Sequence, residues 1–233
     1  MIASDVKIQL INIADEKKVS ILQRFFKTGK GEYGEGDKFL GILVPLIRVV
    51  AKQNKEIGMT EIISLLKDPW HECRLCALLI LTEKFKKAEE TLRRQIYEVY
   101  LNHTTYINNW DLVDLSCRDI VGEYLIDKDR SPLYQLSGSK NLWEQRIAIV
   151  STFAFIRRND LNDTFLLSEK LLEHKHDLIH KAVGWMLREA GKKDEDRLTQ
   201  FLQKHYTRMP RTMLRYAIEK FPEEKRAFFM KKD

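Results

Sequence analysis

The chain has 233 residues and a formal net charge of +6, and 44% of its residues are apolar. That apolar share is enough for a packed core and excludes wholesale disorder. Five prolines and ten glycines are few for this length, which argues against an all-β protein with its many turns. The excess of basic residues favours a polyanionic partner.

The cellular compartment can also be inferred from the sequence. No stretch reaches the roughly 18 uncharged apolar residues that a bilayer span requires, and the opening segment MIASDVKIQL lacks the basic end and apolar run of a signal peptide. Three cysteines, an odd number, do not suggest a disulfide framework. We therefore expect a protein of the reducing cytoplasm without a membrane partner.

In chain order, the first distinctive segment is TGKGEYGEGD at residues 28–37, which contains a literal G-x-G-x-x-G from Gly29 to Gly34 and a further glycine, Gly36. A dinucleotide-binding loop would follow a strand and open a helix, whereas this segment follows the helical pattern ILQRFFK. Acidic residues within it would repel a pyrophosphate; they are Glu32, Glu35 and Asp37. We interpret the segment as a flexible loop between helices.

Beyond this loop the chain reads as a series of helices. Apolar residues recur at three- and four-residue spacing, the helical period, in residues 61–67, 73–85, 92–101 and 165–173. Prolines mark helix ends or starts, because the residue before a proline is pushed out of the α region. These prolines follow Asp68, Ser131, Met209 and Phe221. Since no segment alternates with period two, the sequence predicts an all-α fold.

Two clusters of possible metal ligands lie in these helical regions. Cys73 and Cys76 form a C-x-x-C pair within an apolar helical run, and because only Cys117 remains as a further thiol, we expect buried structural cysteines. Near a later helix start, three histidines lie within EHKHDLIH, namely His174, His176 and His180. Here we favour a solvated turn over a metal site, so that no metal or organic cofactor is expected.

A charged residue recurs near the start of successive helical runs, and its positions are Arg74, Asp114, Arg146, Lys181 and Arg215. They are separated by 40, 32, 35 and 34 residues, and each is followed two positions later by a small residue. This pattern is typical of HEAT-type helix-pair repeats, whose units stack because none can bury its apolar face alone. We predict one HEAT-like domain over residues 1–233, a solenoid curved around a basic concave groove, with the last few residues disordered.

Four of these five repeated positions are cations, which suits a nucleic-acid backbone because each cation can neutralise one phosphate. The alternative is that the four side chains hydrogen-bond neighbouring repeats, and the sequence leaves both roles open. Arg208 and Arg211 add positive charge beside Arg215 in the last repeat.

The remaining repeated position, Asp114, admits two roles. It could form a salt bridge with a neighbouring arginine, or it could stabilise a positive charge that develops in the groove. Cleavage of an N-glycosidic bond develops such a charge, since the sugar becomes oxocarbenium-like.

Tryptophans near the repeated charged positions favour the second role of Asp114, the stabilisation of a developing positive charge. Trp110 lies one helical turn before Asp114, and Trp185 lies four residues after Lys181 and three before Arg188. Aromatic rings in these positions can flank a cation. The other two tryptophans, Trp70 and Trp143, are expected in the core.

Three segments together resemble the AlkD-type bacterial DNA alkylation-repair proteins, which are HEAT-like DNA glycosylases. They are NNWDLVDL at 108–115, NLWEQRIAIV at 141–150 and KAVGWMLRE at 181–189, and the likeness extends to FLGILVPLIR at 39–48. The resemblance implies a monofunctional glycosylase that removes N3- or N7-alkylated purines such as 3-methyladenine and 7-methylguanine from duplex DNA. It also implies a bacterial-type cytoplasmic protein, associated with the nucleoid when acting, and we expect a monomer.

The resemblance assigns roles to particular residues. Asp114, rather than Asp111, matches the catalytic aspartate, and Trp110 and Trp185 match the aromatic pair that packs on the deoxyribose. Arg146 matches an arginine that grips the backbone at the lesion, and Arg188 resembles a further phosphate contact. We add Arg74, Lys181, Arg211 and Arg215 as expected DNA contacts. A HEAT-type scaffold that binds protein or unusual DNA without catalysis is the alternative function.

The chain also departs from the family pattern in its N-terminal part. Phe25 stands where active members tend to have a tyrosine, and Leu43 replaces a polar residue near Pro45. Both positions belong to the helices expected to approach the DNA near the lesion, so they bear on lesion preference and rate.

Overall fold

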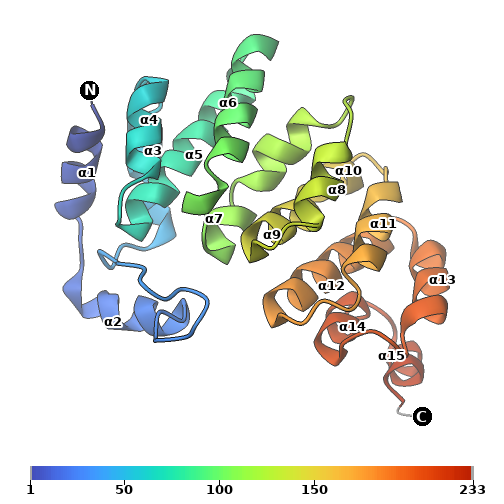
Figure 1. Ribbon diagram of the computed structural model, residues 1–233. Coiled ribbons are helices and arrows are strands. Elements are labelled where there is room, and N and C mark those ends of the chain that lie inside the picture. Colours follow the sequence, from blue (N-terminus) through green and yellow to red (C-terminus); the bar gives the residue numbers. More distant parts are fainter. Residues whose placement is uncertain (1, 232–233) are drawn as a thin grey trace. The chain divides into compact units, whose positions relative to one another are not determined.

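The computed structural model describes residues 2–231, and its regular elements in that range are helices (Figure 1). The fold is therefore an all-α helical-repeat fold, as predicted. The chain divides into two compact units, one ending at Ile120 and the other starting at Val121. A single domain with a basic concave groove stays a prediction, and residues 232 and 233, part of the end expected to be disordered, lie outside the described residues.

Helix α5 is the centre of the N-terminal unit. It packs against α1, α3, α4, α6 and α7, and its buried residues include Leu75, Leu78 and Ile80. Helix α2, by contrast, contains no buried residue. The elements of this unit are α1 (Ala3–Ile11), α2 (Glu16–Phe25), α3 (Val44–Gln53), α4 (Met59–Leu66), α5 (His71–Lys87), α6 (Glu90–Asn102), a 3-10 turn (Thr104–Tyr106) and α7 (Trp110–Asp114).

Helix α12 has the corresponding place in the C-terminal unit, where it packs against α9, α10, α11, α13 and α14. At Gly184 its backbone approaches α14 so closely that an added Cβ would lie 2.5 Å from the carbonyl oxygen of Met213. A π-helical turn (Arg118–Gly122) crosses the boundary between the units. The helices are α8 (Ser131–Ser137), α9 (Leu142–Ser151), α10 (Phe153–Ile156), α11 (Asn162–Lys170), α12 (Asp177–Gly191), α13 (Glu195–His205), α14 (Arg211–Ala217) and α15 (Glu223–Met230).

The predicted helices are confirmed with one shift in position. Helices α4, α5 and α6 correspond to the segments 61–67, 73–85 and 92–101, whereas α11 starts at Asn162 and ends at Lys170, with a turn at 171–173. Pro210 and Pro222 are the residues immediately before α14 and α15, as expected of residues that cannot continue a helix. None of the helices among the described residues has both the length and the apolar character of a membrane span.

The three cysteines are buried and form no disulfide with one another, in agreement with the prediction of buried structural cysteines. Burial raises the pKa of the Cys76 thiol to about 12 and also raises the pKa of Cys73. Both thiols therefore stay protonated at neutral pH and serve as packing groups. Trp143 is likewise buried in α9, as expected, whereas Trp70, also expected in the core, is only half-buried.

Candidate functional site

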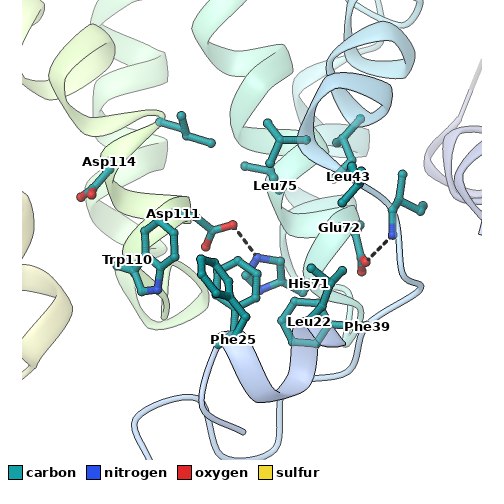
Figure 2. Close-up of a pocket in the computed structure, with 15 residues that line it drawn as sticks. Leu22, Phe25, Phe39, Leu43, His71, Glu72, Leu75, Trp110, Asp111 and Asp114 are labelled. Atoms are coloured by element: carbon teal, nitrogen blue, oxygen red, sulfur yellow. Dashed lines mark hydrogen bonds and ion pairs between the residues drawn. The ribbon is translucent and has the colours of Figure 1, made fainter. Parts of the chain in front are cut away.

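The N-terminal unit contains a pocket of about 330 Å³ lined by residues of α2, α3, α5 and α7 and of the loop before α3 (Figure 2). Its walls are mostly apolar. The lining residues are Leu22, Phe25, Phe26, Phe39, Ile42, Leu43, Val44, Ile47, His71, Glu72, Leu75, Trp110, Asp111, Asp114 and Leu115. Two predicted catalytic residues, Trp110 and Asp114, thus lie on one pocket, and both are partly exposed.

Aromatic side chains from the segment at the end of α2 hold Trp110 in place. The ring of Phe26 stacks on the Trp110 indole with centroids 5.2 Å apart, and the exposed Phe25 meets the indole edge-on at 5.6 Å. Phe26 also stacks on Phe39 at 5.2 Å. Such offset and edge-on arrangements are the favoured geometries of aromatic pairs. The indole of Trp110 is therefore fixed on one side while its other surface reaches solvent.

The pocket has three acidic side chains with different surroundings. Glu72 and Asp111 are 1% and 3% exposed and are held by hydrogen bonds inside the unit. Asp114, at the end of α7, keeps a partly exposed side chain at the pocket. Among the residues that line the pocket, Asp114 is therefore the carboxylate that a ligand can reach.

Beneath the pocket lies a buried ionic network centred on His71. Its Nε2 lies 2.9 Å from Oδ2 of Asp111 (Figure 2). Its Nδ1 lies 3.1 Å from Oδ2 of Asp37. Burial on its own would lower the pKa of His71, but Asp111 and Asp37 outweigh it and raise the pKa to about 9. Since both ring nitrogens face carboxylates, the imidazolium form satisfies both as a donor.

Asp37 is the second centre of this network. Its other oxygen accepts a hydrogen bond from Nη2 of Arg74, and Nδ2 of Asn109 lies 3.4 Å from its Oδ2. Burial opposes the charge of this carboxyl group, but the hydrogen bond from His71 and the charge of Arg74 lower its pKa overall. Asp37 therefore remains ionised inside the unit and connects α5 to the segment before α7.

Glu72 fixes the loop that leads into α3. Its carboxylate accepts hydrogen bonds from the backbone N–H groups of Leu40, Gly41 and Ile42 at 2.9 to 3.1 Å. Gly41 has φ +84°, and an added Cβ would lie 2.0 Å from the carbonyl oxygen of Asp15. This clamp sets the position of Leu43 and of the pocket wall that α3 provides.

The glycine-rich segment is a hydrogen-bonded loop rather than an open linker. The carboxylates of Glu32 and Glu35 accept the backbone N–H groups of Gly29 and Gly31, the kind of donor that a nucleotide phosphate would need. Gly34 donates to the carbonyl of Lys27 and leaves no room for a Cβ. The loop ends at Asp37, and its role here is to deliver that carboxylate to the buried network.

The repeated charged positions share a register in the C-terminal unit. Arg146, Lys181 and Arg215 are each the fifth residue of their helix, and α12 packs against both α9 and α14. Asp114 is likewise the fifth residue of α7. The spacing read from the sequence therefore corresponds to the same place in α7, α9, α12 and α14, whereas Arg74 is the fourth residue of α5.

These positions differ in how far they reach solvent. Arg146 is 5% exposed and donates to the backbone carbonyl of Leu178. Lys181 pairs with Asp177 at 2.7 Å on the surface, and Arg215 is exposed. Arg74 is 4% exposed, and besides Asp37 its guanidinium binds the carbonyl oxygens of Asp68 and Pro69. Because Arg74 is directed into the unit, we do not include it among the proposed DNA contacts.

The other expected contacts also belong to the C-terminal unit. Arg188 pairs with Glu189 and Glu219, and Arg211 is exposed and donates to the carbonyl of Met230. Trp185 is partly exposed, with the ring of Phe153 at 6.0 Å. Each of these side chains has a surface that solvent reaches.

The histidines at the start of α12 are engaged in local hydrogen bonds. His174 bonds the Gln145 side chain through Nε2, and its Nδ1 accepts the N–H of His176. His176 accepts the N–H of Leu178, and His180 bonds the carbonyl of His174. Burial lowers the pKa of His174 and His176. The cluster thus caps a helix, which accounts for it without a metal.

The ionic network around His71 and the aromatic contacts of Phe25 and Phe26 with Trp110 were not predicted from the sequence. Asp37, His71 and Asp111 are separated by 34 and 40 residues, so no local spacing connects them. Two features of the sequence could have pointed to these groups: the doublet Phe25–Phe26 for the aromatic contacts of Trp110, and Asp37 at the end of the glycine-rich segment for the ionic network. Phe25 and Leu43, the departures from the family pattern, both line the pocket and make its wall apolar.

Comparisons with known proteins agree with this fold. The family model for DNA alkylation repair enzymes matches residues 6–221. A predicted DNA alkylation repair enzyme from Enterococcus faecalis has a similar structure with a TM-score of 0.69, at 13% identity, over 90% of this chain and 97% of that one. At this identity the structural likeness concerns the fold alone. No curated protein matches the chain by sequence.

Proposed function

The chain belongs to the family of DNA alkylation repair enzymes, and on this premise we propose that it is a monofunctional glycosylase of alkylated purines in duplex DNA. Its substrates would be cationic N3- and N7-alkylated bases such as 3-methyladenine and 7-methylguanine. Membership of the family already gives a role in alkylation repair with DNA as substrate. The bond that breaks and the residues that act are the parts that we propose.

The observation that carries the proposal is the reachable carboxylate of Asp114 beside the fixed indole of Trp110, on a pocket with mostly apolar walls. A negative charge acts more strongly where water is partly excluded, because the effective dielectric constant is lower. An oxocarbenium-like sugar would be stabilised there by the carboxylate and by the aromatic surface.

The proposed reaction places few demands on the protein. The oxygen of a water molecule bonds to C1′, the C1′–N bond breaks, and its electron pair neutralises the cationic purine as it leaves. One of the two protons of the water passes to solvent, and the other stays in the new hydroxyl group on C1′. Asp114 stabilises the sugar cation and orients the water, and each 1.36 kcal/mol of preferential stabilisation gives about tenfold in rate.

The C-terminal unit would supply the backbone contacts. Arg211 and Arg215 are exposed, and Lys181 and Arg188 are held in pairs that reach solvent. Such cations can neutralise phosphates and release their counterions. Arg146 is about as buried as Arg74 and donates to the carbonyl of Leu178. We keep it as a contact only because the resemblance assigns it that role, which it does not do for Arg74, and we keep Trp185 as the second sugar-packing ring on the same ground.

Replacement of Asp114 by Asn tests the proposal most directly. Asp114→Asn should slow the release of 7-methylguanine from methylated duplex DNA by about 100-fold or more, since the charge at the reacting sugar is lost. DNA affinity should stay the same or rise, because a negative charge near the backbone is removed. Chromatography of released bases and a fluorescence binding titration give the two readouts.

Asp119→Asn is the matched control, because Asp119 is also partly exposed and lies near Asp114 in the sequence but does not line the pocket. It should keep the wild-type rate. Equal rates for wild type and Asp114→Asn would remove the catalytic assignment. Binding of methylated DNA without any release by the wild type would favour the alternative of a non-catalytic scaffold.

A further inference from the structure

Helix α7 carries both Trp110 and Asp114, yet it is only five residues long. A helix of that length has little stability of its own, so its position depends on tertiary contacts. Asn109 caps it by accepting the N–H of Trp110 at 2.9 Å, and Leu112 and Val113 are fully buried. Asp111 makes a polar contact between α7 and α5, a helix that also lines the pocket.

Asp111 divides its carboxylate between α7 and α5. One oxygen accepts the N–H of Leu112 at 2.8 Å, and the other lies 2.9 Å from Nε2 of His71, the first residue of α5. On its opposite side His71 meets Asp37, which is held in turn by Arg74 and Asn109. His71 is thus the bridge between the end of the glycine loop, the start of α5 and α7.

The surroundings of His71 favour its charged form. The rings of Phe39 and Phe26 pack on the imidazole with centroids at 4.5 and 5.0 Å, and aromatic faces attract a cation. The charged groups that face it directly are Asp37 from the loop and Asp111 from α7, while Arg74 of α5 acts through Asp37. A neutral ring would offer one lone pair to a carboxylate, which leaves a buried repulsive contact.

We propose that His71 is a positioning residue for the glycosylase reaction: as an imidazolium between Asp37 and Asp111 it fixes α7 and, with it, Trp110 and Asp114 at the pocket. His71 itself is 2% exposed and does not need to touch the substrate. The relation to catalysis rests on the proposed function. A displacement of about 1 Å at a reacting group can cost about 100-fold in rate, so loss of this bridge should slow base release by up to that factor.

The pH at which the bridge breaks follows from the raised pKa. Asp111 and Asp37 raise the pKa of His71 from its ordinary value to about 9 against the effect of burial. The stabilisation is therefore complete below pH about 6.5 and declines as the pH rises through about 9. Above that pH the neutral ring no longer holds both carboxylates, and α7 should loosen.

The first experiment observes α7 directly. Protein labelled with 5-fluorotryptophan gives one ¹⁹F signal for each of its four tryptophans, and loss of a signal in Trp110→Phe assigns Trp110. We expect the Trp110 signal to shift between pH 7 and 10.5 with a midpoint near 9. The shift should vanish in the charge-matched double variant His71→Gln/Asp111→Asn, which removes one charge of each sign. A Trp110 signal that does not titrate, or that titrates equally in the double variant, overturns the proposal.

The second experiment measures base release. Single-turnover release of 7-methylguanine by the wild type should fall above pH about 9, and the double variant should be slower with no such fall. His205→Gln is the matched control, because His205 is also 2% exposed and lies near an acid, Glu169, in the other unit. This variant should show the same decrease of the release rate above pH about 9 as the wild type. If the release rate of the folded double variant still decreases above pH about 9, the positioning role of His71 is contradicted.

The two proposals can fail separately. If the wild type releases no methylpurine at any pH, the proposed function fails, while the ¹⁹F titration still decides whether His71 fixes α7. If the double variant does not fold, as judged by circular dichroism, the wild-type titration decides, since a pH-independent Trp110 signal refutes the bridge.

Discussion

The two units of the chain hold their charged side chains in opposite ways. In the N-terminal unit Asp37, His71, Arg74 and Asp111 are buried and bind one another. In the C-terminal unit two of the cations expected to meet DNA, Lys181 and Arg188, form ion pairs that reach solvent, and Arg211 and Arg215 are exposed. Buried ions resist separation because each would be left without a partner, whereas exposed pairs contribute little and exchange easily.

This difference matches the two tasks that we propose. A reaction centre needs fixed geometry, which a desolvated network around α7 provides. Backbone binding needs cations that can leave a carboxylate for a phosphate at little cost, and an exposed pair permits this. In this proposal the N-terminal unit fixes the geometry of the reaction centre, and the C-terminal unit supplies cations that can exchange a carboxylate for a phosphate.

The largest effect on folding should come from Arg74→Ala. It removes one partner of a buried pair and leaves Asp37 with less compensation, so the free energy of unfolding should fall by about 3 kcal/mol. Arg188→Ala, which breaks an exposed pair with Glu219 and a half-buried pair with Glu189, should cost less, about 1 kcal/mol. Urea unfolding followed by circular dichroism measures both. Equal costs for the two variants would refute the contrast between the units.

A second test separates burial from DNA contact within the charged row. Arg146→Ala and Arg215→Ala should each reduce the log–log salt slope of DNA binding by about 0.9, if each side chain neutralises one phosphate. Only Arg146→Ala should also lower the melting temperature, because Arg146 is buried and donates to Leu178. A salt slope unaltered by Arg146→Ala would mean that this arginine serves helix packing alone.

The smallest effect is expected at Asp177. Asp177→Asn removes the carboxylate that pairs with Lys181 on the surface, which should change the free energy of unfolding by less than about 1 kcal/mol. DNA affinity should rise about twofold at low salt and lose that gain at high salt, because the interaction is screened. A fall in affinity at low salt would show that Lys181 does not exchange its partner for a phosphate.

Much of the candidate site was predictable because it follows from local spacing. Trp110 and Asp114 lie one helical turn apart, and both line the pocket as that spacing indicates. The repeat of charged residues indicated the register, since Arg146, Lys181 and Arg215 occupy the same place in α9, α12 and α14. The helical repeat of the backbone sets which positions of the sequence lie on the same face, so this spacing can be read from the sequence.

The same register does not tell which charges are buried. Arg74 and Lys181 occur in the same sequence pattern, yet Arg74 binds Asp37 inside its unit and Lys181 lies at the surface. Glu72 and Asp111 read as ordinary helical acids, but one clamps a loop and the other holds His71. The contacts of Arg74 with Asp37, of Glu72 with its loop and of Asp111 with His71 join residues 30 or more positions apart in the chain.

The order of helices, their boundaries near the prolines, the buried thiols and the recurrence of charge were determined by the sequence alone, because each rests on neighbours within a few turns. The pocket, the ionised His71 and the division between fixed and exchangeable charges were decided by the tertiary structure. The free energies involved depend on whether residues distant in the chain exclude water from a pair of charges. A desolvated pair is costly to break, whereas a solvated pair exchanges its partners at little cost.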